Sequence, residues 1–307
     1  PYTTLFRSFT PSYLPDAGSP LAADADAARA YPNLASAATS FYPKFLDRTD
    51  CTSTAGLCTW AEEVQNYANW LTYHSTRVEL AKTGIGIAFQ PLNPTFRLGW
   101  ATINDAANNN RLIAGVQLYN STTKAAFLTW LYGLSTPGGT PNRIAIDTIG
   151  RYYKRDDANG PWATSPPAGP ATANMTGSSV TTHASCRRAY SLLMTDGYYN
   201  DSFSLTDVDT TVGVTVPKPS PYTYTPIGPF SDVSQGAGWS NSFADVAMKY
   251  WATDLLPNID NKIKPNANDP AYWQHMNFYA IGLGVVGNLD ATSAQLKADL
   301  TGDASTV

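Results

Sequence analysis

The chain has 307 residues, of which 43% are hydrophobic and only 14% charged, with a formal net charge of −4. This length and apolar content are enough for one large domain or two small ones with a buried core. The negative balance argues against nucleic acid as a partner, because phosphate binding requires a basic face, and a polar but weakly charged, aromatic-rich chain is typical of an exported surface protein.

The N-terminal segments lack regular patterning. Residues 1–8, PYTTLFRS, read like a translated sequencing adapter. We interpret them as non-native, which makes the chain a fragment of a longer reading frame; the alternative is an ordinary irregular N-terminus. Residues 9–58 are rich in Pro, Ala, Ser and Asp without a sustained period, which predicts an irregular arm or insertion. No segment reaches the roughly 20 apolar residues of a membrane span.

Three cysteines bear on the environment of the chain. Cys51 and Cys58 bracket a short polar loop, CTSTAGLC, whose spacing favours a disulfide formed in an oxidising compartment. A zinc pair is the rival interpretation, but the chain has no second Cys/His pair at ligand spacing. Cys186 is left over, either as a buried thiol or as the partner of a cysteine outside this chain.

The first regular elements follow the cysteine loop. A helix is predicted from Trp60 to about Ile87, because apolar residues recur at steps of three, four or seven. Thr59 and Glu62 carry the signature of a capping box at its start. Further elements are a strand at 96–104 (FRLGWATIN), a polar turn (DAANNNR), a strand at 112–120 (LIAGVQLYN) and a helix at 124–134.

Helices and strands alternate through the second half of the chain. Pro141 is expected at the first position of a helix. Long surface loops are predicted at 156–185 and 200–240, from their Pro, Gly, Ser and Thr content. The remaining predicted elements are buried strands at 188–197 (RAYSLLMTDG) and 275–287 (HMNFYAIGLGVVG), and helices at 242–256 and 293–300. This alternation predicts an α/β fold with a sheet covered on both faces.

Two loops carry candidate ligand atoms for a metal. In α/β sheets, ligands bind beyond the carboxyl ends of the strands. There the motif GGTP offers the hydroxyl of Thr140, and the motif TDG offers the carboxylate of Asp196. Hard oxygen atoms of this kind select Mg²⁺, Mn²⁺ or Ca²⁺. On chemistry alone, a TDG at a strand end is more often a plain turn, and GGTP is equally a motif for the start of a helix.

The pairing of GGTPNRIAI with LLMTDGYYND resembles von Willebrand factor A domains. The wider match is to that region of the type IV pilus tip adhesin and assembly proteins, the PilY1/PilC family. Its segments occur here in the family's order: AEEVQNYANWLTYHSTRVELAK, FRLGWATIN, GGTPNRIAIDTIGRYY, CRRAYSLLMTDGYYND, SFADVAMKYWATDL and DPAYWQHMNFYAIGLGVVG. The resemblance implies a doubly wound sheet with helices on both faces over residues 59–307.

The resemblance also implies a metal-ion-dependent adhesion site with Thr140 and Asp196 as ligands. The family's third ligand loop, Asp-x-Ser-x-Ser, does not occur in this chain. We therefore expect an incomplete domain that lacks the first central strand and the last strand, and that binds a divalent cation weakly or not at all. Asn200 and Asp201 are candidates for the rim of the site, with turn formation as the alternative.

The resemblance implies a non-enzymatic role in cell-surface adhesion and type IV pilus biogenesis. The expected partners are minor pilins and host or abiotic surface ligands, and the expected location is the bacterial cell surface, at the pilus tip or the outer membrane. One alternative is a structural interaction module with a vestigial metal site. The other is a secreted hydrolase, against which stands the absence of a Gly-x-Ser-x-Gly motif.

Overall fold

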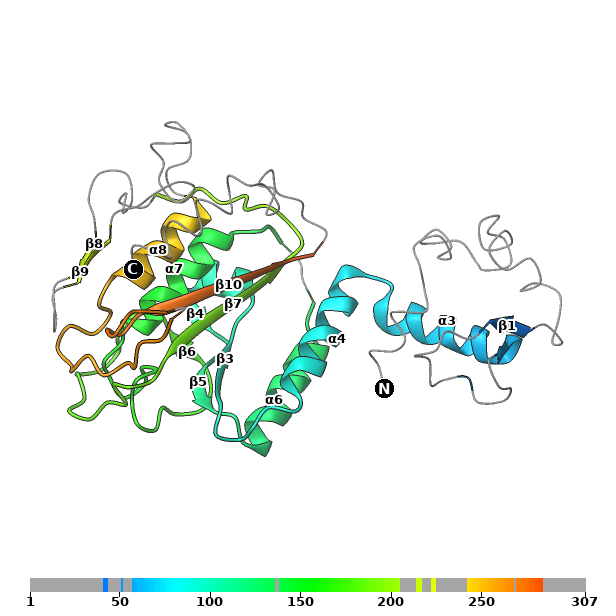
Figure 1. The fold of residues 1–307 in the computed structure, drawn as a ribbon, viewed down its shortest axis with the longest axis horizontal. Coiled ribbons are helices and arrows are strands. Elements are labelled where there is room, and N and C mark those ends of the chain that lie inside the picture. Colours follow the sequence, from blue (N-terminus) through cyan, green and yellow to red (C-terminus); the bar gives the residue numbers. More distant parts are fainter. Residues whose placement is uncertain are drawn as a thin grey trace. The chain divides into compact units, whose positions relative to one another are not determined.

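The computed structural model describes residues 41–43, 51, 57–135, 138–204, 214–216, 222–224, 242–267 and 269–283. The chain divides into two compact units, Pro1–Phe89 and Gln90–Val307 (Figure 1). Residues 1–8, which we interpret as non-native, lie outside the described residues. So do most of the predicted arm and the helix predicted at 293–300.

The described part of the first unit consists of a strand pair and two helices. Strand β1 (Phe41–Pro43) pairs antiparallel with β2 (Leu57–Thr59), and α3 (Trp60–His74) and α4 (Arg77–Phe89) follow. The predicted capping box is confirmed: the backbone N–H of Thr59 donates to Glu62 Oε2 at 2.8 Å, and the N–H of Glu62 donates to Thr59 Oγ1 at 3.3 Å.

The single helix predicted from Trp60 to Ile87 is wrong, because it is broken between α3 and α4. Ser75 ends α3, and the hydroxyl of Thr76 accepts a hydrogen bond from the N–H of Glu79 at 3.1 Å. A Ser-Thr pair offers backbone groups such side-chain partners, which compete with a continuous helix.

The second unit begins with strand β3 (Arg97–Trp100), which pairs antiparallel with β5 (Ala114–Leu118). A short strand β4 (Arg111–Leu112) precedes β5, and helix α6 (Ser121–Tyr132) follows it. The predicted strands at 96–104 and 112–120 are therefore present in shortened form.

The polar turn predicted between these strands is wrong, because most of its residues, 105–109, belong to helix α5 (Ile103–Asn109). Thr102 starts the helix, since its hydroxyl accepts a hydrogen bond from the N–H of Asp105 at 2.9 Å. Asn110 ends it in the left-handed region with φ 52°, a conformation that asparagine tolerates.

The rest of the second unit is built on a parallel strand pair. Strand β7 (Ala189–Thr195) pairs with β10 (Met276–Gly282). Helix α7 (Asn142–Tyr153) precedes β7, and α8 (Phe243–Ala252) precedes β10. The short strands are β6 (Ala171–Thr172), which pairs with β4, and the antiparallel pair β8 (Val214–Val216) and β9 (Tyr222–Tyr224).

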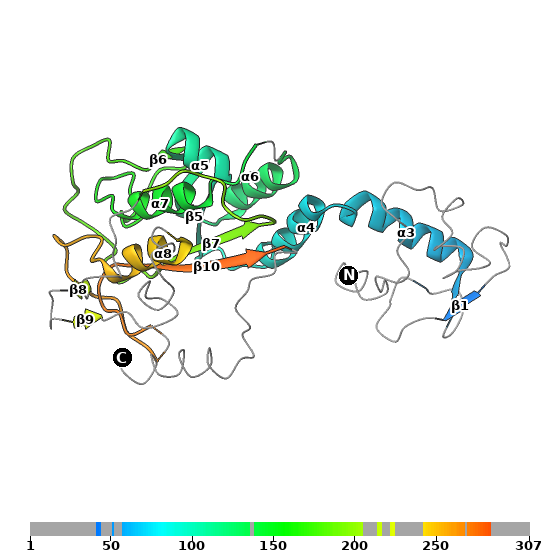
Figure 2. The same cartoon turned by 90° about the horizontal axis from the view of Figure 1, so that it is seen from above.

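Helices α7 and α8 lie side by side along one face of the β7–β10 pair (Figures 1 and 2). Their buried side chains form the main core, which includes Ile146, Val246 and Tyr250 together with Met276 of β10. The approach of the helices is close at Gly150, where an added Cβ would lie 2.3 Å from the ring of Tyr250. This position therefore admits only glycine unless the Tyr250 ring or the helices shift.

The opposite face of the β7–β10 pair is exposed. Alternate residues of both strands point to it, and four large side chains there are 41–56% exposed: Tyr190, Leu192, Tyr279 and Ile281. The prediction that these two strands are buried is thus wrong for this face. The register explains the sequence pattern, because every second residue packs under α7 and α8 while the alternate apolar residues point away from them.

The segment after α7 is held by a buried ion pair. The guanidinium of Arg155 bonds the carboxylate of Asp157 at 2.6 Å, and both side chains are almost fully buried. Burial alone would raise the pKa of Asp157. Hydrogen bonds from Arg155 and from the backbone of Thr176 and Gly177 hold this pKa below its ordinary value instead. Trp162 is also buried, so this part of the predicted surface loop contributes to the core.

The fold is mixed α/β with small sheets. The described strands form five two-stranded ladders, and no ladder between described residues joins β7 to β3 or β5. A continuous doubly wound sheet stays a prediction. None of the helices that the structure describes is both long and apolar enough to cross a bilayer.

Candidate functional site

The loop before α7 and the loop after β7 lie against each other at one edge of the second unit. The backbone N–H of Thr140 donates to Asn200 Oδ1 at 2.7 Å, and the N–H of Asn200 donates to the carbonyl oxygen of Thr140 at 3.1 Å. The side chain of Asn142 donates to the carbonyl oxygen of Gly197 at 3.4 Å. The GGTP and TDG motifs, more than 50 residues apart in the chain, are thereby joined.

The loops that carry the two predicted metal ligands, Thr140 and Asp196, meet at this edge. A Cβ added to Gly197 would lie 3.6 Å from Oγ1 of Thr140, so the threonine hydroxyl faces the turn that carries Asp196. Thr140 is half-buried and Asp196 is exposed. The hydroxyl and carboxylate oxygens suit a hard cation in kind.

The donor set around these two residues is small. Mg²⁺ takes six oxygen ligands in an octahedron and retains several waters. The groups of three or more His, Cys, Asp or Glu side chains that converge in the described residues do not include Asp196. One carboxylate and one hydroxyl therefore make a partial set of ligands.

Of the two predicted rim residues, Asp201 is buried behind the edge of the site and Asn200 is exposed. The side chain of Asp201 is only 1% exposed, and its carboxylate bonds Arg143 Nε at 2.7 Å and the backbone N–H of Ile144 at 3.1 Å. Asn200 bridges the two loops through Thr140, as described above. Both residues therefore hold the loops together.

Asp201 also supplies the cap that helix α7 lacks in its own sequence. Pro141 is the N-cap residue of α7 and not, as predicted, its first helical residue, because the helix begins at Asn142; Pro141 provides no side-chain hydrogen bond. The carboxylate of Asp201 binds an N–H of the first helical turn instead, where the helix dipole favours negative charge.

Two residues that the sequence did not single out contribute to this edge. The guanidinium of Arg143 lies 4.0 Å from the centre of the Tyr199 ring, in a cation–π contact. Asn104, in α5, donates from its side chain to the carbonyl oxygen of Gly139 at 3.3 Å. Recognition of helix α5 in the sequence would have been the signal that placed Asn104 near this edge.

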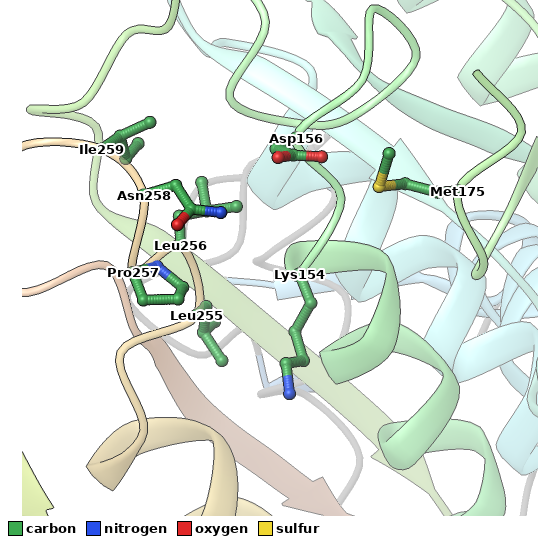
Figure 3. Close-up of a pocket in the computed structure, with 8 residues that line it drawn as sticks. All are labelled: Lys154, Asp156, Met175, Leu255, Leu256, Pro257, Asn258 and Ile259. Carbon is green, nitrogen blue, oxygen red and sulfur yellow. The ribbon is translucent and has the colours of Figure 1, made fainter. Parts of the chain in front are cut away.

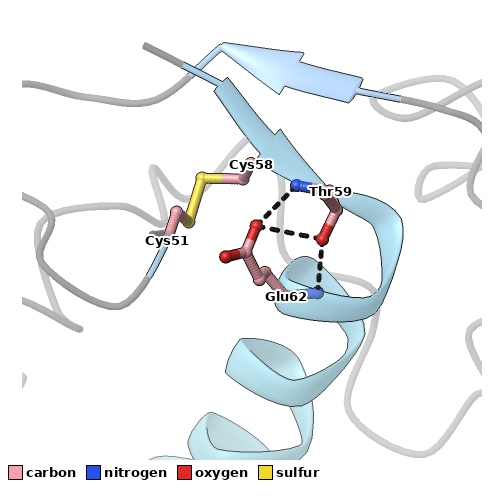
Figure 4. The surroundings of a disulfide bond; sticks show 4 residues. All are labelled: Cys51, Cys58, Thr59 and Glu62. Atoms are coloured by element: carbon pink, nitrogen blue, oxygen red, sulfur yellow. Dashed lines mark hydrogen bonds between the residues drawn. A yellow bond between two sulfur atoms is a disulfide. The ribbon is translucent and has the colours of Figure 1, made fainter. Parts of the chain in front are cut away.

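In the first unit, Cys51 and Cys58 form a disulfide bond with an S–S distance of 2.08 Å (Figure 4). Each residue is fully buried. A carboxylate oxygen of Glu63 and the two sulfur atoms all lie within 4.8 Å of one another. Zinc binding requires thiolates, however, and the disulfide removes them. Cys186 is exposed and free, which contradicts its interpretation as a buried thiol.

Comparisons with known proteins give one consistent result. No family model and no solved structure matches the chain. The chain is 32% identical over 281 residues to the type IV pilus biogenesis factor PilY1 of Pseudomonas aeruginosa strain PAK, and 31% identical over 261 residues to PilY1 of strain UCBPP-PA14. These alignments cover 82% and 75% of this chain but only 23% and 19% of the two relatives. The chain therefore belongs to the PilY1 family and is similar to a segment of PilY1 that makes up about a quarter of the first relative's length.

Proposed function

We propose that the chain is a segment of an exported type IV pilus biogenesis factor of the PilY1 family. The observation that carries the proposal is the 32% identity over 281 residues to a protein with that name. The whole protein would act at the bacterial cell surface, with minor pilins as assembly partners. Its role is binding and assembly rather than catalysis.

The part of the protein represented here would be a von Willebrand A-like domain. The parallel β7–β10 pair with α7 and α8 on one face supports this proposal, and so does the meeting of two polar loops at the carboxyl end of β7. A further strand beside β7 would complete the sheet, since β7 pairs with β10 alone among the described strands.

The candidate site would contribute to adhesion through a divalent cation. Thr140 would supply a neutral oxygen and Asp196 a negative one, and the cation when bound would present an open position to an acidic group of a surface ligand. Asn200 and Asp201 would position the two loops. Because the described residues supply a partial ligand set, we expect the chain to bind Mg²⁺ or Mn²⁺ weakly or not at all.

The decisive experiment combines a variant with two readouts in the full-length protein. Asp196→Ala should reduce adhesion of cells to a surface while leaving the number of pili unchanged. Asp260→Ala is the matched control, because Asp260 is an exposed aspartate whose only described ion pair is with Lys262. A chain that binds Mg²⁺ with micromolar affinity in calorimetry, lost in Asp196→Ala, would contradict the expected weak site.

A structural interaction module is the second candidate function. The observation that favours it is the buried position of Asp201, which leaves Asp196 as the exposed carboxylate of the loop pair. Adhesion and piliation that both survive Asp196→Ala would support this second function and overturn the adhesion site.

A further inference from the structure

Two arginine side chains of the second unit converge on one backbone carbonyl group. Arg97 lies in β3, and Arg187 lies just before β7. The Nη2 atom of Arg97 donates to the carbonyl oxygen of Thr164 at 3.0 Å, and Nη2 of Arg187 donates to the same oxygen at 3.3 Å. The separation of the two nitrogen atoms therefore cannot exceed the sum of these distances, which brings two positive charges close together.

The guanidinium of Arg187 is fixed by the backbone of the loop that carries Thr164. Its Nη1 atom donates to the carbonyl oxygen of Ala163 at 2.6 Å and to that of Pro161 at 3.1 Å. The loop is itself anchored, because Trp162 is buried and its side chain donates to a carbonyl oxygen at the end of α7 at 2.7 Å. The charge of Arg187 is thus held in place before a ligand arrives, which reduces the entropic cost of binding.

The two positive charges have no carboxylate to balance them. Elsewhere in the described chain, arginines pair with aspartates: Arg111, Arg143, Arg151, Arg155 and Arg188. The described partners of Arg97 and Arg187 are neutral carbonyl oxygens instead. Burial and the neighbouring charge of Arg97 lower the pKa of Arg187. The two cations therefore repel each other, and an anion that bridges them would remove this repulsion.

Both side chains retain N–H groups for a ligand. Within the described residues, Arg187 makes three hydrogen bonds through its terminal nitrogens and Arg97 makes one. Each guanidinium carries further N–H donors, the Nε–H among them. Both arginines are partly exposed, and Thr164 is exposed. The unbalanced charge is therefore within reach of a dissolved anion.

The arginine pair does not line the cavity at the end of α7. That cavity has a volume of about 240 Å³, and Figure 3 shows the segment after α8 facing Lys154, Asp156 and Met175 across it. An anion at Arg97 and Arg187 is held by charge and hydrogen bonds, without enclosure in this cavity. We therefore expect a modest affinity that depends on ionic strength.

The number of charges favours a phosphate monoester as the anion. A phosphoryl group carries a charge of about −1.5 to −2 at pH 7 and three acceptor oxygens. One such group can therefore balance both guanidiniums and accept hydrogen bonds from each, and the fork of an arginine matches phosphate oxygens in pairs. A carboxylate carries a single negative charge, so it would leave one of the two cations unbalanced.

We propose that Arg97 and Arg187 form a binding site for a phosphate monoester. The carbonyl oxygen of Thr164 sets the spacing of the two cations, and the phosphate group bridges them. This site lies at the amino end of β7, whereas Asp196 follows the carboxyl end of the same strand. The inference therefore depends neither on the proposed metal site nor on the proposed pilus role.

Calorimetry on the 307-residue chain with glycerol 3-phosphate, near neutral pH and at constant ionic strength, tests the proposal. The probe should bind saturably with a dissociation constant on the order of 1 mM. Acetate, which supplies one charge, should bind at least about tenfold more weakly. No saturable heat up to about 20 mM probe, or equal binding of the two anions, would overturn the proposal.

Matched variants localise the binding. Arg97→Gln should weaken it by about tenfold, and Arg97→Lys, which keeps the charge but loses the fork, by about threefold. Arg77→Gln is the control, because it makes the same change at an exposed arginine of the first unit. Circular dichroism checks that each variant is folded, and Arg187→Lys repeats the test from the other member of the pair. Unchanged affinity in Arg97→Gln, or an equal loss in Arg77→Gln, would contradict the site.

Vesicles identify the source of the phosphate group. Phosphatidylcholine vesicles that contain phosphatidic acid present a monoester on a membrane, and vesicles with the same fraction of phosphatidylglycerol present a diester. Cosedimentation with phosphatidic acid alone, lost in Arg97→Gln, assigns the site to a lipid headgroup. Binding of glycerol 3-phosphate without cosedimentation assigns it to a soluble phosphate ester. Equal cosedimentation with both lipids would indicate attraction to any anionic surface and would refute recognition of a monoester.

Discussion

Asp201 joins two parts of the chain that are remote in sequence. Its carboxylate pairs with Arg143 and caps the first turn of α7, 57 residues earlier. A buried carboxylate with these partners is costly to disturb, since loss of its charge leaves Arg143 with an uncompensated buried charge. The strand-end loop and the helix therefore depend on one residue for their alignment.

Replacement of Asp201 by asparagine should lower the free energy of unfolding of the second unit by about 3 kcal/mol. Urea denaturation monitored by circular dichroism measures it. The exposed control Asp260→Asn should leave the denaturation midpoint unchanged. Equal midpoints for wild type and Asp201→Asn would show that the pair with Arg143 does not stabilise the fold.

Asp147 connects α7 to α8 and makes stability depend on pH. Its carboxylate accepts hydrogen bonds from the hydroxyl of Tyr250 at 2.6 Å and from Lys249 at 3.2 Å. Burial alone would raise the pKa of Asp147. The hydrogen bonds from Tyr250 and Arg151, together with the charge of Lys249, hold this pKa below its ordinary value instead.

A lowered carboxyl pKa gives stability that is complete above the unfolded-state pKa, about 3.9, and is lost as the pH falls through the folded-state pKa. Asp147→Asn should therefore cost about 2 kcal/mol at pH 7 and progressively less below pH 4. Denaturation of both proteins across this pH range measures the difference. A gap between them that stays constant down to pH 2 would contradict the assignment.

At the scale of elements, the packing of α7 against α8 depends on Gly150. Alanine is favoured over glycine inside a helix by about 1 kcal/mol. Here the added Cβ would lie 2.3 Å from the ring of Tyr250, a contact that must displace the buried ring or the helices. Overpacking of this kind costs about 1–3 kcal/mol, so the steric effect outweighs the propensity.

Gly150→Ala should accordingly destabilise the second unit by about 2 kcal/mol. The matched control is Gly84→Ala in α4, where an added Cβ meets nothing within 4 Å. That substitution should stabilise its helix by up to about 1 kcal/mol. Thermal denaturation distinguishes the two, and shifts of the same sign in both variants would refute the steric argument.

Local signals predicted the elements whose ends are fixed by neighbouring residues. Thr59 and Glu62 sit three positions apart, and their capping box correctly gave the start of α3. Helix α5 was missed because its cap, Thr102, follows an apolar run that favours a strand. The break at Ser75 and Thr76 was missed because apolar periodicity continues across it.

The arrangement of the candidate site was beyond local signals. The motifs led to Thr140 and Asp196 as residues of one edge, and the structure places both of their loops there. The pairing of Arg143 with Asp201 joins positions 58 apart, and the sequence contains no spacing rule for such a pair. Whether the edge binds metal stays a prediction.

At the scale of the whole molecule, the chain consists of two units with different means of stabilisation. The second unit has a buried core of aromatic and aliphatic side chains. In the first unit, the disulfide Cys51–Cys58 closes a loop immediately before α3. In the chain-entropy account, closing a loop of this length lowers the conformational entropy of the unfolded chain. This raises the free energy of the unfolded state by about 2–3 kcal/mol.

Reduction should therefore affect the two units differently. In the presence of a reductant, or in the Cys51→Ser/Cys58→Ser double variant, limited proteolysis should cut within 57–74 faster and leave the rate of cutting within 142–153 unchanged. Cys186→Ser is the control, because this thiol is free and exposed. Equal acceleration at both segments would contradict the assignment of the disulfide to one unit.

The reciprocal hydrogen bonds between the two loops have a consequence for motion. The amide protons of Thr140, Ile144 and Asn200 are each held by a group on the facing loop or helix. None can be released to solvent unless the loops separate, so these amides should open in one cooperative event and exchange with deuterium at a common rate. The tip of β7 and the first turn of α7 are thus a single dynamic unit, and a ligand bound to either loop would slow exchange in both.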